Sequence, residues 1–284
     1  MNVIRLTEEK LKEIIEETVK KTLQEYHGLD IDRDSRTVHF TDEHERNLDT
    51  SLKSNPTSYD AEICGMQVMV YSLFQRKRGI HGDGNPALYA LKREKRWMMD
   101  NEDAFMERFK LVLNKFLSEH SNNVVVPIPS TNLLNNRFAD AIKETIPDIK
   151  FCSPIGKMST DEVWDYCDEA DSYFCNFWRE KEVDLNVAFD MLGEALTEMN
   201  ETNDGIFSYH HIKDWNLRNS IIHTLKALPK EHGRYRQDID GNDILLIDDS
   251  ITRGQTIEDA IFAIQQLYEP RSISVLTIFS NLKD

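Results

Sequence analysis

The sequence predicts an α/β protein whose core is a mostly parallel, twisted sheet with helices on both sides. Two short apolar runs carry this prediction, Val124–Val126 and Ile244–Ile247. Each run is too short for a helix, and each is followed by a polar loop and then by apolar residues at helical spacing. That order is typical of buried parallel strands joined to crossover helices. Around this core the sequence predicts an N-terminal helical segment (residues 1–84) and a helical insertion (about 156–230) within the α/β domain of residues 85–284.

Composition limits the class of protein. The chain has 284 residues, of which 40% are hydrophobic, and this is enough for a packed core. Its formal net charge of -16 argues against a general nucleic-acid binder, because neutralisation of phosphates drives that binding. No apolar run has the length of a membrane span and the N-terminus lacks the apolar stretch of a secretory signal, so we expect a cytoplasmic protein without a membrane partner. The four cysteines lack metal-ligand spacing, which favours reduced thiols.

The N-terminal part shows mainly helical periodicity. Residues 7–26 carry apolar groups at helical spacing, with acids first and lysines later, as the helix dipole favours, and Gly28 is placed to end this helix. Residues 28–58 are polar, and Thr37–Phe40 is their only strand-like piece, so we expect little core there. Helical spacing returns over 61–75, at Ile63, Met66, Met69, Val70 and Leu73.

Basic residues gather around the Gly-rich turn at 79–86. Such a local field could attract a polyphosphate, and a solvated helix face of mixed charge explains the cluster equally well. The residues are Arg76, Lys77, Arg78, His81, Lys92, Arg93, Lys95 and Arg96. Pro86 is placed to open the next helix, and apolar spacing predicts another over Phe105–Leu117.

The first buried strand, at Val124–Val126, leads into a polar loop, and we expect the next helix to start at Phe138. The loop offers backbone amides, amide side chains and the guanidinium of Arg137, which is suited to bidentate contact with a phosphate. In isolation this segment is an ordinary strand-to-helix unit with a surface arginine. A further strand is predicted at Ile149–Ser153.

The second buried strand, at Ile244–Ile247, ends in the acid pair Asp248 and Asp249. A short loop containing Gly254 follows, then an amphipathic helix over Thr256–Leu267, and a last strand over 272–279. Backbone amides of a tightly curled loop at a helix N-terminus can bind a phosphate, and the carboxylates can accept hydrogen bonds from ribose hydroxyls. The alternative is a plain strand-to-helix turn with capping Asp and Thr residues.

The segment Asp248-Asp249-Ser250-Ile251-Thr252-Arg253-Gly254-Gln255-Thr256 resembles the phosphoribosyl pyrophosphate (PRPP) motif of type I phosphoribosyltransferases, in its amidophosphoribosyltransferase variant. Together with Ala90-Leu91-Lys92 and with Pro127-Ile128-Pro129-Ser130 followed by Arg137-Phe138, it is similar to the ComF-like group of that family. The chain departs from that group in having no N-terminal zinc finger and no Gly between Arg137 and Phe138. The resemblance implies a phosphoribosyltransferase-type sheet and assigns a role to each motif.

As the resemblance implies, Asp248 and Asp249 are the catalytic acids that hold the ribose hydroxyls. The PRPP-binding loop comprises Ser250, Ile251, Thr252, Arg253, Gly254, Gln255 and Thr256, and the pyrophosphate loop contributes Pro129, Ser130, Thr131, Asn132 and Arg137. Candidates for a hood over the substrate are Lys92, His210, His211, Lys213 and Arg218, although the histidine-rich cluster is explained more simply by helix capping and surface packing. Mg²⁺ is expected to arrive with PRPP and to bind mainly substrate oxygens and water.

Three functional hypotheses stay open. The first is a phosphoribosyltransferase that releases pyrophosphate from PRPP and has an unidentified acceptor. The second is a protein that binds PRPP or a nucleotide for regulation and has lost transfer. The third is an interaction protein in which the N-terminal helices assemble with partners, and a homodimer is one such assembly. A reaction cannot be inferred from a fold alone.

Overall fold

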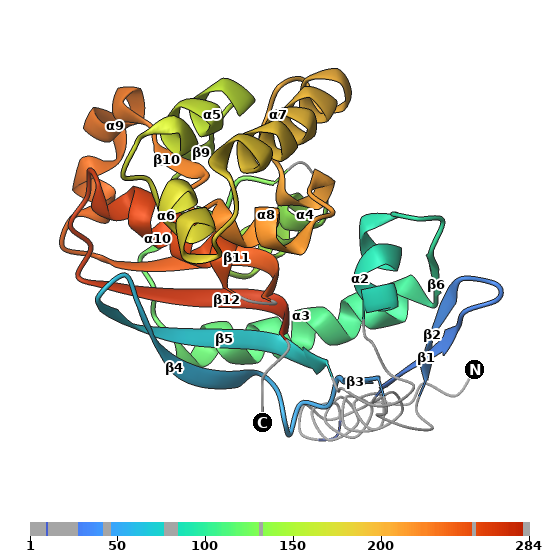
Figure 1. The fold of residues 1–284 in the computed structure, drawn as a ribbon. Helices are drawn as coiled ribbons and strands as arrows, with labels where there is room; N and C mark the ends of the chain where they lie inside the picture. The colour runs from blue at the N-terminus through green and yellow to red at the C-terminus, as the bar shows by residue number, and fades with distance from the viewer. Residues whose placement is uncertain are drawn as a thin grey trace.

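The computed structural model describes residues 10, 28–41, 47–76, 85–130, 133–251 and 254–280 (Figure 1). The described chain is a mixed α/β structure with a mostly parallel sheet flanked by helices. The helix predicted over 7–26 lies outside the described residues, apart from Lys10.

The main sheet comprises β3 (Leu48–Asp49), β4 (Thr57–Ile63), β5 (Met66–Arg76), β7 (Val124–Pro127), β8 (Lys150–Phe151), β11 (Asp243–Ile251) and β12 (Ser272–Ser280). The strand order is β3-β5-β12-β11-β7-β8, with β4 also paired to β5. The five strands from β5 to β8 run parallel, and β3 and β4 are antiparallel to β5. The strands predicted at 124–126, 149–153, 244–247 and 272–279 are confirmed.

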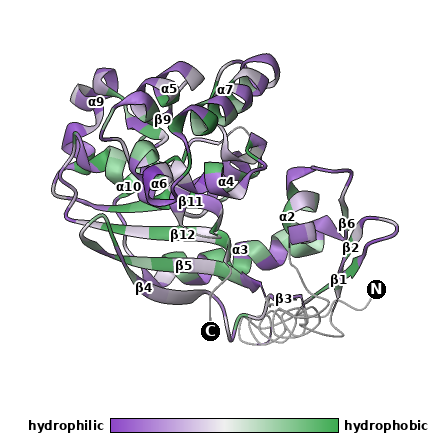
Figure 2. Cartoon of the chain, in the orientation of Figure 1, coloured by the Kyte–Doolittle hydropathy of each residue, from purple (hydrophilic) through white to green (hydrophobic). Residues whose placement is uncertain are grey.

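The central strand β11 is buried on both faces, which explains the uninterrupted apolar run Ile244–Ile247 within it. Leu245 and Ile247 pack on one side with α3 (Glu102–Glu119) and α4 (Leu133–Thr145). Ile244 and Leu246 pack on the other side with α10 (Gln255–Gln265). Figure 2 shows the central strands β11 and β12 and helix α10 as mainly hydrophobic, whereas α9 (Pro229–Ile239) is mainly hydrophilic.

The predicted helices over 86–92 and 105–117 correspond to α2 (Asn85–Lys92) and α3, and the helix predicted over 256–267 corresponds to α10. Helix α4 starts at Leu133, five residues before the predicted start at Phe138. The physical reason is that Leu134, Phe138 and Ile142 are spaced four residues apart and are all buried on one face. Arg137 therefore lies on a helix and not in a loop.

The helix predicted over 61–75 is wrong, because this segment forms the hairpin of β4 and β5. Cys64 and Gly65 make a two-residue turn with φ of 51° and 74°, which is the backbone that hairpin turns of this kind require. Pairing of β5 with β12 then places Val68 and Val70 in the core. The segment of residues 1–84, predicted as helical, thus contains strands over much of 28–76, and β5 belongs to the main sheet.

Residues 28–41 also have more core than predicted. β1 (Gly28–Asp32), β2 (Thr37–Thr41) and β6 (Met98–Asp100) form a small sheet in the order β1-β2-β6. The predicted strand at Thr37–Phe40 is confirmed as β2. Leu29, Val38 and Phe40 are buried in the same core as α3.

The predicted helical insertion is present and is closed by a two-stranded stem. β9 (Ile155–Lys157) pairs antiparallel with β10 (Leu225–Ala227). Between them lie α5 (Thr160–Asp168), α6 (Tyr173–Glu180), α7 (Leu185–Thr202), the short 3-10 helix η1 (Tyr209–His211) and α8 (Trp215–Ser220). These helices have their own core, which includes Trp178, Leu192 and Met199, and they gather on one side of the main sheet (Figure 1).

Candidate functional site

A cavity of about 500 Å³ lies at the carboxyl ends of β7 and β11. Its walls come from α2, the segment after β7, the β9–β10 stem, the insertion and the end of β11. A smaller cavity of about 60 Å³ adjoins it at the N-terminus of α10. The residues that line both are Tyr209, Arg218, Asp248, Ser250 and Thr256. Ligands of parallel α/β sheets bind at this edge, and the larger volume suits a small molecule.

The acid pair forms the floor of the larger cavity. Asp248 and Asp249 are 8% and 5% exposed. Oδ1 of Asp248 accepts hydrogen bonds from the side-chain amide of Asn135 at 3.2 Å and from the backbone N–H of Asp249 at 2.9 Å. Oδ2 of Asp249 lies 2.8 Å from the ammonium of Lys92, and its Oδ1 accepts from the hydroxyl of Ser250 at 2.8 Å. Both carboxylates are thus held in fixed positions.

Two groups at the larger cavity, Asp248 and Lys157, have shifted pKa values. Burial, and then the charge of Asp249, raises the pKa of Asp248 to about 7, against the opposing hydrogen bond from Asn135. Burial lowers the pKa of Lys157, while the nearby charge of Asp248 acts in the opposite direction. Lys157 lines the same cavity from the end of β9. Shifted pKa values of this kind cluster at functional sites.

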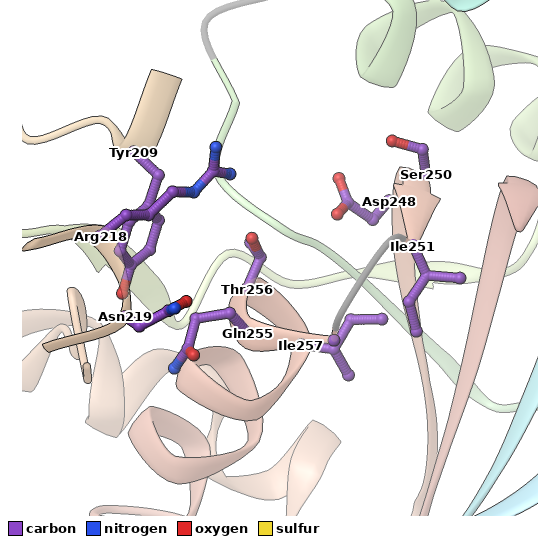
Figure 3. Close-up of a pocket in the computed structure, with 10 residues that line it drawn as sticks. Tyr209, Arg218, Asn219, Asp248, Ser250, Ile251, Gln255, Thr256 and Ile257 are labelled. Carbon is purple, nitrogen blue, oxygen red and sulfur yellow. The ribbon is translucent and has the colours of Figure 1, made fainter. Parts of the chain in front are cut away.

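The N-terminus of α10 has features of an anion site. Gly254 has φ of 84°, a left-handed conformation that glycine adopts without strain, and it places Gln255, Thr256 and Ile257 at the helix N-terminus beside the smaller cavity. Figure 3 shows the hydroxyl of Thr256, the carboxylate of Asp248 and the guanidinium of Arg218 facing the same space. Free backbone N–H groups and the dipole at such a terminus favour phosphate.

Two members of the predicted PRPP loop have side chains engaged elsewhere. Ile251 packs in the core with α10, and the amide of Gln255 donates to Oδ1 of Asp259 at 3.2 Å. These two residues can contribute only through their backbone or by shaping the wall. Thr252 and Arg253 lie outside the described residues.

The insertion reaches the site through Tyr209 and Arg218. The hydroxyl of Tyr209 donates to the backbone carbonyl of Ile221 at 2.9 Å and to Asp259 at 3.3 Å, so the ring is fixed over the start of α10. The guanidinium of Arg218 lies 5.8 Å from the centre of that ring, and Asp214 caps the short helix that carries it. Arg218 is the predicted hood residue that the structure brings to both cavities.

The other predicted hood residues have different positions. Lys92 and His211 line the larger cavity, whereas the side chain of Lys213 is 86% exposed and lies 3.9 Å from Glu198. His210 belongs to η1, and its side chain lies outside the described part of the structure. The predicted hood therefore has Lys92, His211 and Arg218 at the cavity and Lys213 away from it.

The predicted pyrophosphate loop is only partly present. Pro129 and Ser130 line the larger cavity, and Thr131 and Asn132 lie outside the described residues. Arg137 does not line the cavity, because on α4 its guanidinium pairs with Glu102 on α3 at 2.7 Å. The prediction that Arg137 contacts pyrophosphate is therefore not supported by its position.

The basic residues that the sequence groups around residues 79–86 have different environments in the structure. Arg76 is 2% exposed and donates to the side chain of Asn85, while Lys92 faces Asp249. Arg93, Lys95 and Arg96 are exposed, and Lys77, Arg78 and His81 lie outside the described residues. The described members do not form one surface patch.

Sequence reasoning missed three residues at the site. Lys157 and Tyr209 line the larger cavity, and Asn135 holds Asp248. Tyr209 lies within a polar cluster that the sequence displays, and Asn135 within the polar stretch after β7. Lys157 has no local signal, because only the pairing of β9 with β10 brings it to the acids.

The donor atoms at the cavity fit a magnesium ion that arrives with substrate. The described residues contain no group of three or more His, Cys, Asp or Glu side chains placed to hold a metal. The carboxylates of Asp248 and Asp249 face the cavity, and Lys92 already neutralises Asp249. Mg²⁺ that keeps most of its bonds to phosphate oxygens and water needs no more than one such carboxylate.

The chain matches no protein-family model, no curated protein and no solved structure. None of the helices in the described ranges combines the length and the hydropathy of a membrane-spanning segment.

Proposed function

We propose that this protein is a phosphoribosyltransferase-like enzyme that binds PRPP with Mg²⁺ and transfers the phosphoribosyl group to an acceptor with release of pyrophosphate. The main observation in favour is that a buried acid pair and a glycine-containing helix N-terminus meet at one cavity, at the carboxyl end of β11. The resemblance of this segment to the PRPP motif of ComF-like proteins is consistent with that geometry.

Each part of the ligand has a matching part of the site. The 5-phosphate fits the smaller cavity, where Thr256, Arg218 and the backbone N–H groups of α10 provide donors. The ribose hydroxyls fit the acid pair, since carboxylates accept hydrogen bonds from vicinal hydroxyls. The larger cavity, which Ser130 lines, would then hold the pyrophosphate.

Catalysis in such a site would come from positioning and electrostatics. The bond between C1 of the ribose and the pyrophosphate oxygen breaks, and its electron pair leaves with pyrophosphate. The lone pair of an acceptor nitrogen forms the new bond to C1, and the nitrogen releases a proton to solvent. Negative charge on Asp248 and Asp249 stabilises the positive charge that develops on the ribose ring. When bound with the substrate, Mg²⁺ would neutralise phosphate charge.

A second function is favoured by one observation. Arg137 is paired with Glu102 away from the cavity, so the guanidinium expected at the pyrophosphate is missing. A protein that binds PRPP for regulation without transferring it would need no such contact.

Calorimetry with PRPP and MgCl₂, followed by assay of pyrophosphate release over a panel of amines and nucleobases, tests both functions. We expect micromolar binding and acceptor-dependent release, and Asp249→Asn should abolish both. Asp190→Asn, an exposed acid on α7, serves as the control and should change neither. Binding without release from any acceptor would select the regulatory function. Absence of binding by the wild-type protein would exclude both.

A further inference from the structure

Lys157 is a partly buried basic residue that lines the larger cavity of the candidate site. It ends β9, the first strand of the insertion's stem, and lines the larger cavity together with Pro129, Ser130 and the acid pair. It does not line the smaller cavity at the start of α10. Of the two cavities, Lys157 therefore borders only the larger one, which the segment after β7 also lines.

The ammonium of Lys157 has no hydrogen bond or ion pair within the part of the chain that the structure describes. The neighbouring Lys92 differs, because it lies 2.8 Å from Asp249. Burying a cation without a partner is costly, and burial accordingly lowers the pKa of Lys157. A site that keeps such a cation beside an open cavity is suited to an anionic ligand.

The other basic residues considered for the site have different contacts or positions. Arg218 borders both cavities, and in the proposed function it contacts the 5-phosphate at the smaller one. Lys213 is exposed and outside the cavity, and Arg137 is paired on α4. Among the described basic residues that line the larger cavity, Lys157 is thus the one whose side chain has no hydrogen bond, ion pair or ring contact within the described chain.

We infer that Lys157 binds the pyrophosphate group of PRPP and is the residue that replaces Arg137 in this role. This inference rests on the proposed function. The ammonium would pair with a phosphate oxygen in the bound substrate, and it would stabilise the charge that pyrophosphate gains when the C1–O bond breaks with its electron pair. The pyrophosphate subsite is then formed jointly by the segment after β7 and the stem of the insertion.

Comparison of two ligands tests this assignment, because ribose 5-phosphate lacks the pyrophosphate group. Calorimetry with each ligand in MgCl₂ would compare the wild-type protein with Lys157→Met and Lys157→Arg. We expect Lys157→Met to weaken PRPP binding at least about tenfold, as for the loss of one charge-assisted hydrogen bond, and to change ribose 5-phosphate binding less than about twofold. Lys157→Arg should retain part of the PRPP affinity.

Lys213→Met provides the matched control, since it removes the same charge from an exposed site on the insertion. Thermal unfolding of each variant checks that the fold is intact. Equal loss of affinity for both ligands, or no loss for PRPP, would overturn the role of Lys157 while leaving the proposed function standing. Failure of the wild-type protein to bind either ligand would instead overturn the proposed function, and this inference with it.

Discussion

Thr224 donates two hydrogen bonds to a single carboxylate oxygen, Oδ2 of Asp259, from its backbone N–H at 2.9 Å and from its hydroxyl at 2.8 Å. Asp259 is fully buried on α10 and also accepts from the backbone N–H of His223 at 2.8 Å. The side-chain amide of Gln255 donates to it as well, and the hydroxyl of Tyr209 from the insertion lies 3.3 Å from its Oδ2. One carboxylate thus fixes the insertion against the helix whose N-terminus borders the candidate anion site.

Replacement of this carboxylate should loosen the insertion. Asp259→Asn puts an amide NH₂ where N–H and O–H donors converge, so buried donors lose their acceptor. We expect the free energy of unfolding, measured in urea, to fall by about 1–3 kcal/mol. PRPP affinity should fall as well, because Tyr209 and Arg218 lose their support. The exposed variant Asp190→Asn should change neither quantity, and an unchanged unfolding free energy in Asp259→Asn would contradict this interpretation.

Arg218 should act on the 5-phosphate. Because it borders the cavity at the start of α10, Arg218→Met should weaken PRPP and ribose 5-phosphate by the same factor, about 10- to 100-fold for a charge-assisted contact. Calorimetry with both ligands measures this. Arg236→Met, an exposed arginine paired with Asp240 on α9, is the control for loss of one positive charge. Selective loss of PRPP binding alone would show that Arg218 contacts pyrophosphate instead.

Asp248 should make stability depend on pH. Its pKa is raised by burial to about 7 in the folded protein from an ordinary value of 3.8, so between these values the folded state holds a proton that the unfolded state has lost. The free energy of unfolding must therefore decrease as pH rises through this window. Asp248→Asn cannot ionise, so the stability of the wild type relative to this variant should drop by at least about 1 kcal/mol between pH 4 and pH 8.

Urea denaturation at several pH values measures that difference. Asp190→Asn should track the wild type across the whole range, because this acid is exposed. If the wild type and Asp248→Asn keep a constant difference from pH 4 to pH 8, Asp248 is not a buried acid of raised pKa.

Gly254 should matter for binding more than for stability. An added Cβ would meet only the side chain of Ile251, at 3.9 Å, so the cost of Gly254→Ala comes from its φ of 84° and should be about 1 kcal/mol. Relief of that strain would move the loop, and we expect PRPP affinity to fall about tenfold.

Gly65→Ala is a matched comparison, since Gly65 has φ of 74° in the β4–β5 turn and open space around it. It should show a similar loss of unfolding free energy in urea with unchanged PRPP affinity by calorimetry. Equal binding by both glycine variants would argue against a conformational requirement at Gly254.

The part of the fold predicted best from sequence is the part with both faces buried. The runs at 124–126 and 244–247 contain no polar residue, because helices cover both sides of the sheet, and they locate the acid pair at a strand end. The segment 61–75 was harder, since Met66, Val70 and Leu73 fit a helix while Met66, Val68 and Val70 fit a strand. Pairing with β12 decides between them, and the turn at Cys64-Gly65 was the overlooked local signal.

The positions of individual basic side chains could not be predicted from local sequence patterns. The helical spacing of Leu134, Phe138 and Ile142 could have shown that Arg137 lies on a helix, but not that Glu102 would pair with it. Lys157 is more than 90 residues from the acids in sequence, and its place depends on tertiary contacts that no local pattern records.

The pairing of β9 with β10 brings the two ends of the insertion together, and this affects how the insertion could change in evolution. Because Lys157 pairs with Leu225 and Ile155 with Ala227, the chain leaves and rejoins the body of the protein at nearly one point. Residues 158–224 have a core of their own and contribute no strand to the main sheet. A different segment could therefore replace them by recombination without changing the strand order of that sheet. A different insertion would bring new side chains to the larger cavity, while Lys157 would stay in place on the stem. Under the proposed function, the choice of acceptor could then change without loss of the proposed contact to pyrophosphate.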